Sequence, residues 1–304
     1  MNYVATAVLA GLVALPASAQ EWKEDYQTIG FGVLSSENEQ DQLAQYEPYQ
    51  EYLERELGVE IEMFTAGSYD GVVQALAADQ IEFADFGSSS YAAAYTATNG
   101  GVVPMVADVS KDGSSGYYSI VVVRCDSGYE SLADLEGKVH AFADPDSTSG
   151  YAVPYFNFVD MGMDPTEYFA DIPFSGSHEA GVLGVVNGTF DSASTYQNTE
   201  VDGVYQNMEN KDMIEPGQVC AIWESPEITN GPTSARANLP DGLIEAMTAA
   251  TIAFPEKDPE GFRAFTRFSP EDPNPTVGYK RVDHDRYQWI VDMRDWLKRE
   301  RRGG

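Results

Sequence analysis

Short apolar runs alternate with longer amphipathic stretches along the first hundred residues. Three runs rich in β-branched and aromatic residues are typical of strands: TIGFGVL (28–34), VEIEMFTA (59–66) and IEFADFG (81–87). Each precedes a stretch whose apolar residues recur at helical spacing, and these stretches are 41–58, 68–80 and 88–98. This order predicts a mostly parallel sheet covered by helices.

A second α/β unit begins at YYSIVVVRC (117–125), and a helix-rich segment ends the chain. The pattern therefore predicts a hinged clamshell of two α/β lobes, each a mostly parallel sheet flanked by helices. Residues 20–122 and 223–304 form lobe 1, residues 123–222 form the inserted lobe 2, and two hinge strands join them. Ligands of such sheets bind beyond the carboxyl ends of strands, where helix N-termini point.

The first twenty residues, MNYVATAVLAGLVALPASAQ, form an apolar stretch that ends in Ala-Ser-Ala. This pattern predicts a signal peptide over residues 1–19, cleaved after Ala19. A membrane anchor is the weaker alternative, because the stretch is short and contains Pro16. We therefore expect a soluble, exported monomer.

The formal net charge of −31 argues against nucleic acid as a partner, because phosphates would be repelled. It fits a surface adapted to salty water, where charges are screened over short distances. Eight of the 18 basic residues fall between residues 280 and 302. We interpret this basic tail as the solvated end of a helix, which favours cations.

The two cysteines, Cys125 and Cys220, each follow or lie within an apolar strand-like run. In an exported protein an even count favours a disulfide, and two buried free thiols are the alternative. Both residues fall where the chain is expected to pass between lobes. A bridge would then tie the two hinge strands together.

The segment DSTSG (146–150) places three hydroxyls and a glycine at the expected start of a helix. A helix N-terminus offers unpaired backbone N–H groups and a partial positive charge, so added hydroxyls make a set of neutral donors for an oxyanion. Gly150 would permit close approach of a ligand to the backbone. A plain helix cap by Ser147 or Ser149 is the alternative interpretation.

Six segments in the same order resemble the phosphonate- and phosphite-binding proteins of ABC importers, a branch of the type II periplasmic binding proteins. They are IGFGVLSSE, GSYDGVVQALAADQIEFADFG, DGSSGYYSIVVV, DPDSTSGYAVP, GSHEAGVLGVVNGTFD and IWESPEI. The resemblance implies a periplasmic protein that captures a phosphonate-, phosphite- or phosphate-type anion by hinge closure. It implies an ABC permease as partner, and neither catalysis nor a cofactor; delivery to a sensor instead of a permease stays open.

The resemblance also implies which residues bind. The hydroxyls and amides of the Ser-Thr-Ser run and one histidine would hold the anion, and two tyrosines of the other lobe would close over it; these positions are Ser147, Thr148, Ser149, His178, Tyr69 and Tyr117. Ser88 and Ser89 start another expected helix and are weaker candidates, with plain capping as the alternative.

The chain departs from relatives that carry aminoalkylphosphonates, in which two carboxylates hold the ammonium group. Asn198 or Glu200 lies opposite one of these positions, and Gly231 occupies the other. A buried cation without a paired carboxylate loses its compensation. A smaller anion such as phosphite, methylphosphonate or phosphate is therefore at least as strongly favoured.

Other functions are less well supported. A serine hydrolase would need a triad, but no G-x-S-x-G elbow surrounds Ser147 or Ser149. A zinc motif would need a second histidine four residues after His178, and a calcium loop would need a closing Glu where Tyr155 stands, so we expect no metal. A same-fold protein for a quaternary ammonium compound or another small zwitterion is the remaining alternative.

Overall fold

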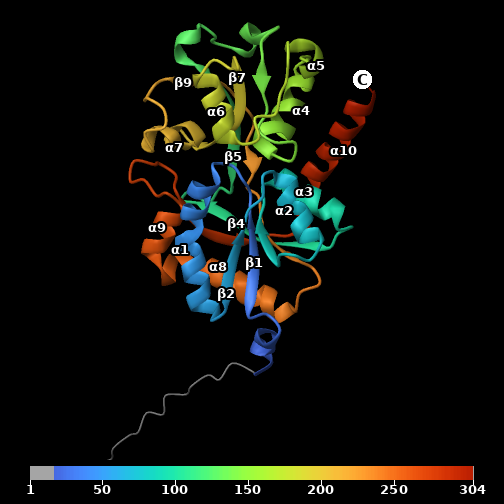
Figure 1. Cartoon of the computed structure of the whole chain (residues 1–304), viewed down its shortest axis with the longest axis vertical. Coiled ribbons are helices and arrows are strands. Elements are labelled where there is room, and N and C mark those ends of the chain that lie inside the picture. The colour runs from blue at the N-terminus through green and yellow to red at the C-terminus, as the bar shows by residue number, and fades with distance from the viewer. Residues whose placement is uncertain (1–16, 304) are drawn as a thin grey trace, which may run out of the picture.

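The computed structural model describes residues 17–303, which fold into two α/β lobes stacked along the long axis (Figure 1). The sheet of lobe 1 has the order β12-β4-β11-β3-β1-β2. Its strands are β1 (Thr28–Val33), β2 (Glu60–Phe64), β3 (Phe83–Asp85), β4 (Val102–Ser110), β11 (Thr233–Arg236) and β12 (Thr276–Arg281). This six-stranded sheet is the centre of lobe 1.

The sheet of lobe 2 has the order β10-β5-β7-β6, with β9 also paired to β5 and β8 to β7. Its strands are β5 (Gly116–Arg124), β6 (His140–Ala141), β7 (Ser192–Thr199), β8 (Asp202–Gly203), β9 (Val219–Glu224) and β10 (Ile228–Thr229). Both sheets are mixed, whereas the sequence pattern predicted mostly parallel ones. Among the strands of residues 17–303, β1–β2, β1–β3 and β6–β7 pair in parallel, and the other pairs are antiparallel.

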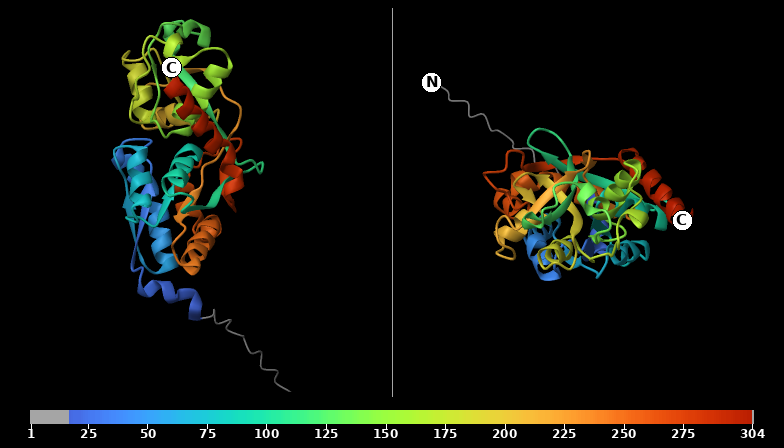
Figure 2. Two further views of the ribbon diagram at one scale, coloured as in Figure 1. Left: turned by 90° about the vertical axis from the view of Figure 1, so that its right-hand side faces the viewer. Right: turned by 90° about the horizontal axis from the view of Figure 1, so that it is seen from above.

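Helices cover both sheets (Figures 1 and 2). Lobe 1 carries η1 (Ala17–Glu24), α1 (Glu39–Leu57), α2 (Tyr69–Ala77), α3 (Ser88–Ala97), α8 (Asp241–Lys257), α9 (Pro259–Phe265), η5 (His284–Tyr287) and α10 (Gln288–Gly303). Lobe 2 carries η2 (Cys125–Ser127), η3 (Leu132–Leu135), the π-helical turn η4 (Thr148–Ala152), α4 (Val153–Asp160), α5 (Pro165–Tyr168), α6 (His178–Val186) and α7 (Val204–Asn210). The helices expected at 41–58, 68–80 and 88–98 correspond to α1, α2 and α3.

The chain changes sheets between Ser110 and Gly116 and again between Thr229 and Thr233. The sequence analysis placed the first crossing later, between residues 122 and 123, and the second crossing earlier, between residues 222 and 223. The difference arises because β5 pairs with β7 from Tyr118 to Val123, which assigns the whole strand to the lobe 2 sheet.

The predicted disulfide between Cys125 and Cys220 is confirmed, with the Cα atoms 5.0 Å apart. It does not tie the hinge strands together, as the sequence had suggested. Cys125 follows the end of β5 that lies away from the crossing, and Cys220 pairs with Val123 inside lobe 2. The bridge therefore fastens β9 to β5 within one lobe.

The C-terminal helix α10 packs against both lobes instead of ending in solvent. It contacts α3 of lobe 1 and η4 of lobe 2, and the Trp296 ring lies edge-on to Phe156 with centroids 5.1 Å apart. Ile290 and Leu297 join a buried cluster that contains residues of both lobes. Figure 2 shows the helix rising from the lower lobe along the side of the upper one. Lys298 and Arg299 are exposed, as our interpretation of a solvated helix end expects, whereas Arg294 of the same helix is largely buried against Asp146.

The predicted signal peptide lies almost entirely outside the described residues, which begin at Ala17. Among the helices of residues 17–303, none has both the length and the apolar character needed to cross a bilayer.

Candidate ligand-binding cleft

A cavity of about 310 Å³ lies between the lobes, and we call it the interlobe cavity. Its walls come from the loop after β1, the carboxyl ends of β3 and β4, the start of β5, the start of α6 and the end of β7. Of the predicted site residues it brings together Tyr69, Tyr117, Ser147, Thr148, Ser149, His178, Asn198 and Gly231. These positions span more than 160 residues of sequence and meet where the two sheets face each other.

The Ser-Thr-Ser run forms one wall of this cavity at the start of η4. Ser147 caps the turn, since its Oγ accepts from the Gly150 N–H at 3.0 Å, and it lies 3.2 Å from His178 Nε2. Thr148 Oγ1 accepts from the Ser89 N–H of lobe 1 at 2.8 Å. All three hydroxyl residues are buried and line the cavity. Ser147 thus caps the turn and also lines the cavity, so capping does not rule out the ligand-binding role that the sequence analysis set against it.

Gly150 is required by packing within lobe 2, which is a different reason from the ligand approach expected from the sequence. A Cβ atom there would lie 2.5 Å from Ala143 Cβ, 2.8 Å from Ser147 Oγ and 2.9 Å from His178 Cε1. These distances leave no room for a side chain. The glycine lets the cap, the histidine and the neighbouring strand close together.

His178 is the first residue of α6, directly after its cap Ser177, and is only 3% exposed. Its Nδ1 lies 3.1 Å from Thr195 Oγ1, which orients the ring toward Ser147. Burial lowers the pKa of His178 to about 4, so the ring is neutral near pH 7. A serine next to an imidazole is also the start of a hydrolase triad, but the third partner here is a threonine hydroxyl and not a carboxylate.

The two tyrosines reach the cavity from different lobes, whereas the resemblance implied that both come from one. Tyr69 begins α2 in lobe 1, and its N–H donates across the cleft to Asp144 Oδ2 at 3.2 Å. Tyr117 lies at the start of β5 in the lobe 2 sheet. Burial raises the pKa of Tyr117, and hydrogen bonds with Thr148 and Ser149 partly oppose that rise. Tyr117 and the Ser-Thr-Ser run line the same cavity.

Three predicted positions do not line the cavity. Ser88 is fully buried and donates to the Thr229 carbonyl at 2.6 Å, and Ser89 Oγ accepts from Arg294 at 2.7 Å. Glu200 instead borders a separate surface depression near Cys220. Gly231 does line the cavity, but a Cβ atom there would lie 1.9 Å from the Phe86 carbonyl oxygen, so no larger residue fits.

Three aspartates also line the cavity, and the sequence interpretation did not include them: Asp85, Asp108 and Asp202. Asp85 ends β3, which runs parallel to β1, so its position at a carboxyl end was an available signal. Asp108 lies inside β4, where a single polar residue is typical of a solvent-facing position. No Lys or Arg lines the cavity among residues 17–303.

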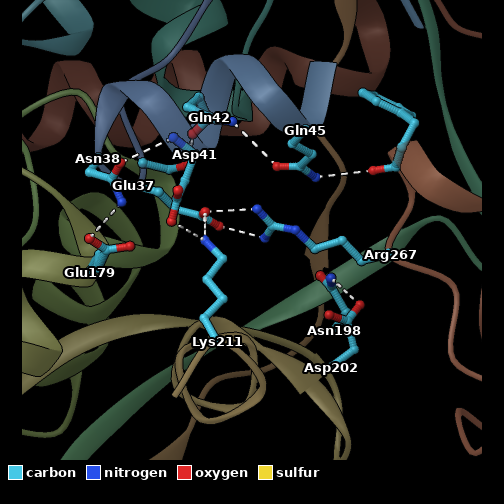
Figure 3. A network of polar contacts seen from close by, with 12 residues as sticks. Glu37, Asn38, Asp41, Gln42, Gln45, Glu179, Asn198, Asp202, Lys211 and Arg267 are labelled. Carbon is cyan, nitrogen blue, oxygen red and sulfur yellow. Dashed lines mark hydrogen bonds and ion pairs between the residues drawn. The ribbon is translucent and has the colours of Figure 1, made fainter. Parts of the chain in front are cut away.

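Ion pairs cross the rim of the cleft (Figure 3). Lys211, directly after α7, lies 2.7 Å from Glu37 and 3.0 Å from Asp41, while Arg267 makes a bidentate pair with Glu37 at 2.5 and 2.7 Å. The backbone N–H of His178 in lobe 2 also donates to the backbone carbonyl of Ser36 in lobe 1 at 3.1 Å. The Lys211 and His178 contacts join lobe 2 to lobe 1 and define a closed arrangement, and Arg267 pairs with Glu37 within lobe 1.

The same rim contains the one group of acidic side chains in residues 17–303 whose oxygens are close enough to hold a metal ion. Glu37, Asp41 and Glu179 have ligand atoms within 4.8 Å of one another. Lys211 and Arg267 already supply positive charge to Glu37 and Asp41. The group is therefore accounted for as an ion-pair network.

Comparison with known proteins gives a consistent result. The family model described as "ABC transporter, phosphonate, periplasmic substrate-binding protein" matches residues 31–287. The "Phosphate-import protein PhnD" of Mycolicibacterium smegmatis is 31% identical over 259 residues, covering 79% of each chain. The "Phosphonates-binding periplasmic protein" of Escherichia coli is 30% identical over 235 residues, covering 74% of this chain and 64% of that protein.

Two solved structures share the fold. A binding protein component of an ABC phosphonate transporter from Pseudomonas aeruginosa aligns with a TM-score of 0.77 and 24% identity, over 90% of this chain and 87% of that one. PhnD1 from Prochlorococcus marinus, in complex with methylphosphonate, aligns with a TM-score of 0.77 and 18% identity, over 90% of this chain and 98% of that one. The two-lobe fold predicted from the sequence is thus confirmed, as is the family resemblance.

Proposed function

The chain belongs to the family of periplasmic substrate-binding proteins of phosphonate ABC transporters, and we propose that its interlobe cavity captures a phosphonyl-type anion for delivery to such a transporter's permease. The observation that carries this proposal is the start of η4. There Ser147, Thr148 and Ser149 line the cavity together with His178 and Tyr117. Hydroxyls, backbone N–H groups and a neutral imidazole suit a tetrahedral oxyanion.

Neutral donors are the physical basis of recognition in this site. The whole chain has a formal charge of −31, and no cationic side chain lines the cavity among residues 17–303. Long-range steering therefore opposes an approaching anion, but salt screens that field beyond about 8 Å at physiological ionic strength. Short-range hydrogen bonds in a closed cavity stay effective at any ionic strength, because they act where water is excluded.

Closure of the two lobes would complete the site. The backbone N–H of Ser89 in lobe 1 donates a hydrogen bond to the Thr148 hydroxyl in lobe 2, and the backbone N–H of Tyr69 in lobe 1 donates one to the Asp144 carboxylate in lobe 2. An anion held by η4 and covered by α2 would contact both lobes at once. Such a ligand binds the closed form better than the open form and shifts the population toward it.

Export and oligomeric state belong to the same proposal. The apolar stretch that ends in Ala-Ser-Ala supports removal of residues 1–19 as a signal peptide. The family supports action in the periplasm, and we propose that the protein acts there as a monomer. Ser88 and Ser89, which do not line the cavity, are assigned a structural part in holding α3 against the rest of the site.

The test is a double substitution in the Ser-Thr-Ser run. Ser147→Ala with Thr148→Ala should weaken binding of the tightest ligand in a panel of phosphate, phosphite, methylphosphonate and 2-aminoethylphosphonate by about 100-fold or more, since each lost donor leaves an anion oxygen unpaired. Isothermal titration calorimetry measures this directly. The control is Ser131→Ala with Thr166→Ala, a serine and a threonine at other helix starts of lobe 2 that are exposed. Equal affinities of the two double variants would reject the assignment.

A further inference from the structure

The loop that leads into the Ser-Thr-Ser run contains two buried carboxylates, although the run is proposed to bind an anion. Asp144 is 3% exposed and Asp146 is 8% exposed. A buried carboxylate near an anion opposes its binding through like-charge repulsion, so other contacts must compensate for both groups. Asp146 has a cationic partner in Arg294, whereas Asp144 is held by backbone N–H groups. One of these N–H groups belongs to the other lobe.

Resting on the function proposed above, we propose that Asp144 is a positioning residue that couples closure of the lobes to capture of the anion. Its carboxylate is carried by lobe 2 and accepts from the backbone N–H of Tyr69 at the start of α2 in lobe 1. This contact fixes Tyr69 over the Ser-Thr-Ser run. Asp144 does not itself line the interlobe cavity, so it acts on the ligand through Tyr69.

Two hydrogen bonds within lobe 2 connect Asp144 to the anion-binding run. Its Oδ1 accepts from the Asp146 N–H at 2.7 Å, and its backbone carbonyl accepts from the Ser147 N–H at 2.9 Å. Ser147 in turn caps η4, where the run begins. The second carboxylate oxygen, Oδ2, accepts from the Tyr69 N–H at 3.2 Å. A single buried side chain is therefore bonded both to the turn that shapes the run and to the opposite lobe.

The lobe 1 end of this contact is a helix start that its own cap leaves incomplete. Ser68 caps α2, because its Oγ accepts from the Gly71 N–H at 3.3 Å. The N–H of Tyr69, the first residue of the helix, donates instead to Asp144. A carboxylate at this position also interacts favourably with the partial positive charge of the helix N-terminus. Closure thus supplies α2 with an acceptor from lobe 2, and opening of the cleft would remove it.

The Tyr69 side chain extends from this anchored backbone to the cavity. It is 4% exposed and lines the cavity together with Tyr117 and Tyr196. Burial, followed by the negative charge of Asp144, raises the pKa of Tyr69 well above its ordinary value. The phenol therefore keeps its proton at neutral pH and can donate it to an anion oxygen in a hydrogen bond. A shift of the start of α2 would move this donor.

Three alternate residues of the loop contact three different elements of lobe 1. Asp144 contacts α2, Asp146 contacts α10, and Thr148 contacts α3. The partner on α2, Tyr69, lines the cavity, whereas the partners on α10 and α3 do not. Of these three contacts, the Asp144 contact therefore connects closure directly to a residue that is placed to meet the ligand.

The first experiment compares Tyr69→Pro with Tyr69→Ala. Both variants lose the phenol, but only proline also lacks the N–H that donates to Asp144. Proline is favoured at the first position of a helix, and the preceding residue, Ser68, already has the extended backbone that a following proline requires, with φ −154° and ψ 161°. Isothermal titration calorimetry uses the tightest-binding ligand among phosphate, phosphite, methylphosphonate and 2-aminoethylphosphonate. Tyr69→Pro should bind it about tenfold more weakly than Tyr69→Ala, the usual effect of losing a hydrogen bond to a charged group.

A second pair of variants separates positioning from stability. Asp144→Ala removes the contact between the lobes, and Asp164→Ala removes the aspartate that caps α5 within lobe 2. Because the Asp144 contact is absent from the open form to which the ligand first binds, Asp144→Ala should raise the dissociation rate about tenfold and leave the association rate within about threefold. Stopped-flow tryptophan fluorescence measures both rates. Asp164→Ala is the control, and it should leave both rates unchanged although it also loses a helix cap.

The outcomes separate the two proposals. If the native protein binds none of the four ligands, the proposed function fails and the positioning role fails with it. If it binds one of them but Tyr69→Pro and Tyr69→Ala have equal affinities, the function stands and the positioning role is rejected. The role is also rejected if Tyr69→Pro stays about tenfold weaker than Tyr69→Ala when both carry Asp144→Ala, because the lost N–H would then act on another group. Should Tyr69→Pro fail to fold, or Tyr69→Ala bind too weakly to measure, the rates of Asp144→Ala decide, and an unchanged dissociation rate rejects the role.

Discussion

Two buried histidines illustrate how position decides the chemistry of one residue type. His178 lines the interlobe cavity, whereas His140 is enclosed in lobe 2 between Ser192 and Ser194, with both ring nitrogens 2.8 Å from their hydroxyls. Desolvation by burial lowers the pKa of His140 to about 3, against about 6.5 in an unfolded chain. Both rings are neutral near pH 7, but only His178 is placed to meet a ligand.

The pKa of His140 gives a prediction for stability. Between pH 6.5 and 3, His140 is protonated in the unfolded state but stays neutral in the folded state. The contribution of His140 to the free energy of unfolding is therefore fully present above pH 6.5 and decreases as the pH falls toward 3. From pH 7 to pH 4.5 the native protein should lose about 2–3 kcal/mol more free energy of unfolding than His140→Gln. Urea unfolding at both pH values measures this difference. Asp108 and His178 titrate in both proteins and cancel, and parallel pH profiles would contradict the prediction.

At the residue scale, the sequence predicted the anion-binding residues better than the acidic ones. Ser147, Thr148 and His178 stand at helix starts, where hydroxyls and exposed N–H groups have a recognisable pattern. Asp108 lies in a strand, and the sequence does not show whether its side chain points to the face of the sheet that lines the cavity or to the solvent-exposed face. Which face is buried depends on the neighbouring strands, and these come from the far end of the chain, from β11 and β12.

At the scale of elements, the periodicity predicted the helices and strands of the first hundred residues, but not the direction in which later strands pair. Strands β11 and β12 join the lobe 1 sheet antiparallel to β3 and β4 after the chain has passed through lobe 2. Local hydrophobic pattern contains no information on such long-range pairing. The same limit applies to α10: the sequence predicted a helix-rich end to the chain, but not that its last helix packs against both lobes.

Helix α10 provides a prediction through Arg294. Its guanidinium lies 2.5 Å from Asp146, which precedes the Ser-Thr-Ser run in lobe 2, and 2.7 Å from Ser89 Oγ in lobe 1. Both charged side chains are largely buried, so Arg294→Ala leaves Asp146 without its partner. We expect a loss of about 1–3 kcal/mol of stability and about tenfold weaker binding of the preferred phosphonate.

Calorimetry and thermal unfolding of Arg294→Ala test this role, and Arg299→Ala on the exposed face of the same helix is the control. Arg294→Lys distinguishes charge from geometry, because lysine keeps the charge but cannot reach two partners with a planar fork. Ligand affinity that is equal in Arg294→Ala and Arg299→Ala would show that α10 does not position the binding site.

At the scale of the whole molecule, net repulsion and specific attraction act against each other. Asp and Glu number 49 against 18 Lys and Arg, so most carboxylates have no cationic partner. The rim pair of Lys211 with Glu37 joins the lobes, while Arg267 pairs with Glu37 within lobe 1. The other ion pairs are mostly exposed and contribute about 0.2–1 kcal/mol each, which is small beside the self-repulsion of a chain with a net charge of −31.

This balance predicts that salt stabilises the protein. Ionic strength of 1 M reduces the screening length to about 3 Å, which weakens the repulsion among many distant carboxylates more than the few close pairs at the rim. Between 0.05 and 1 M NaCl we expect Tm to rise by about 4 °C or more, the shift that a gain of roughly 1–2 kcal/mol gives in a chain of this size. Sucrose of equal osmolality controls for solute exclusion and should give a smaller rise. A fall in Tm with NaCl would mean instead that the ion pairs between the lobes outweigh the repulsion, and that closure is itself sensitive to salt.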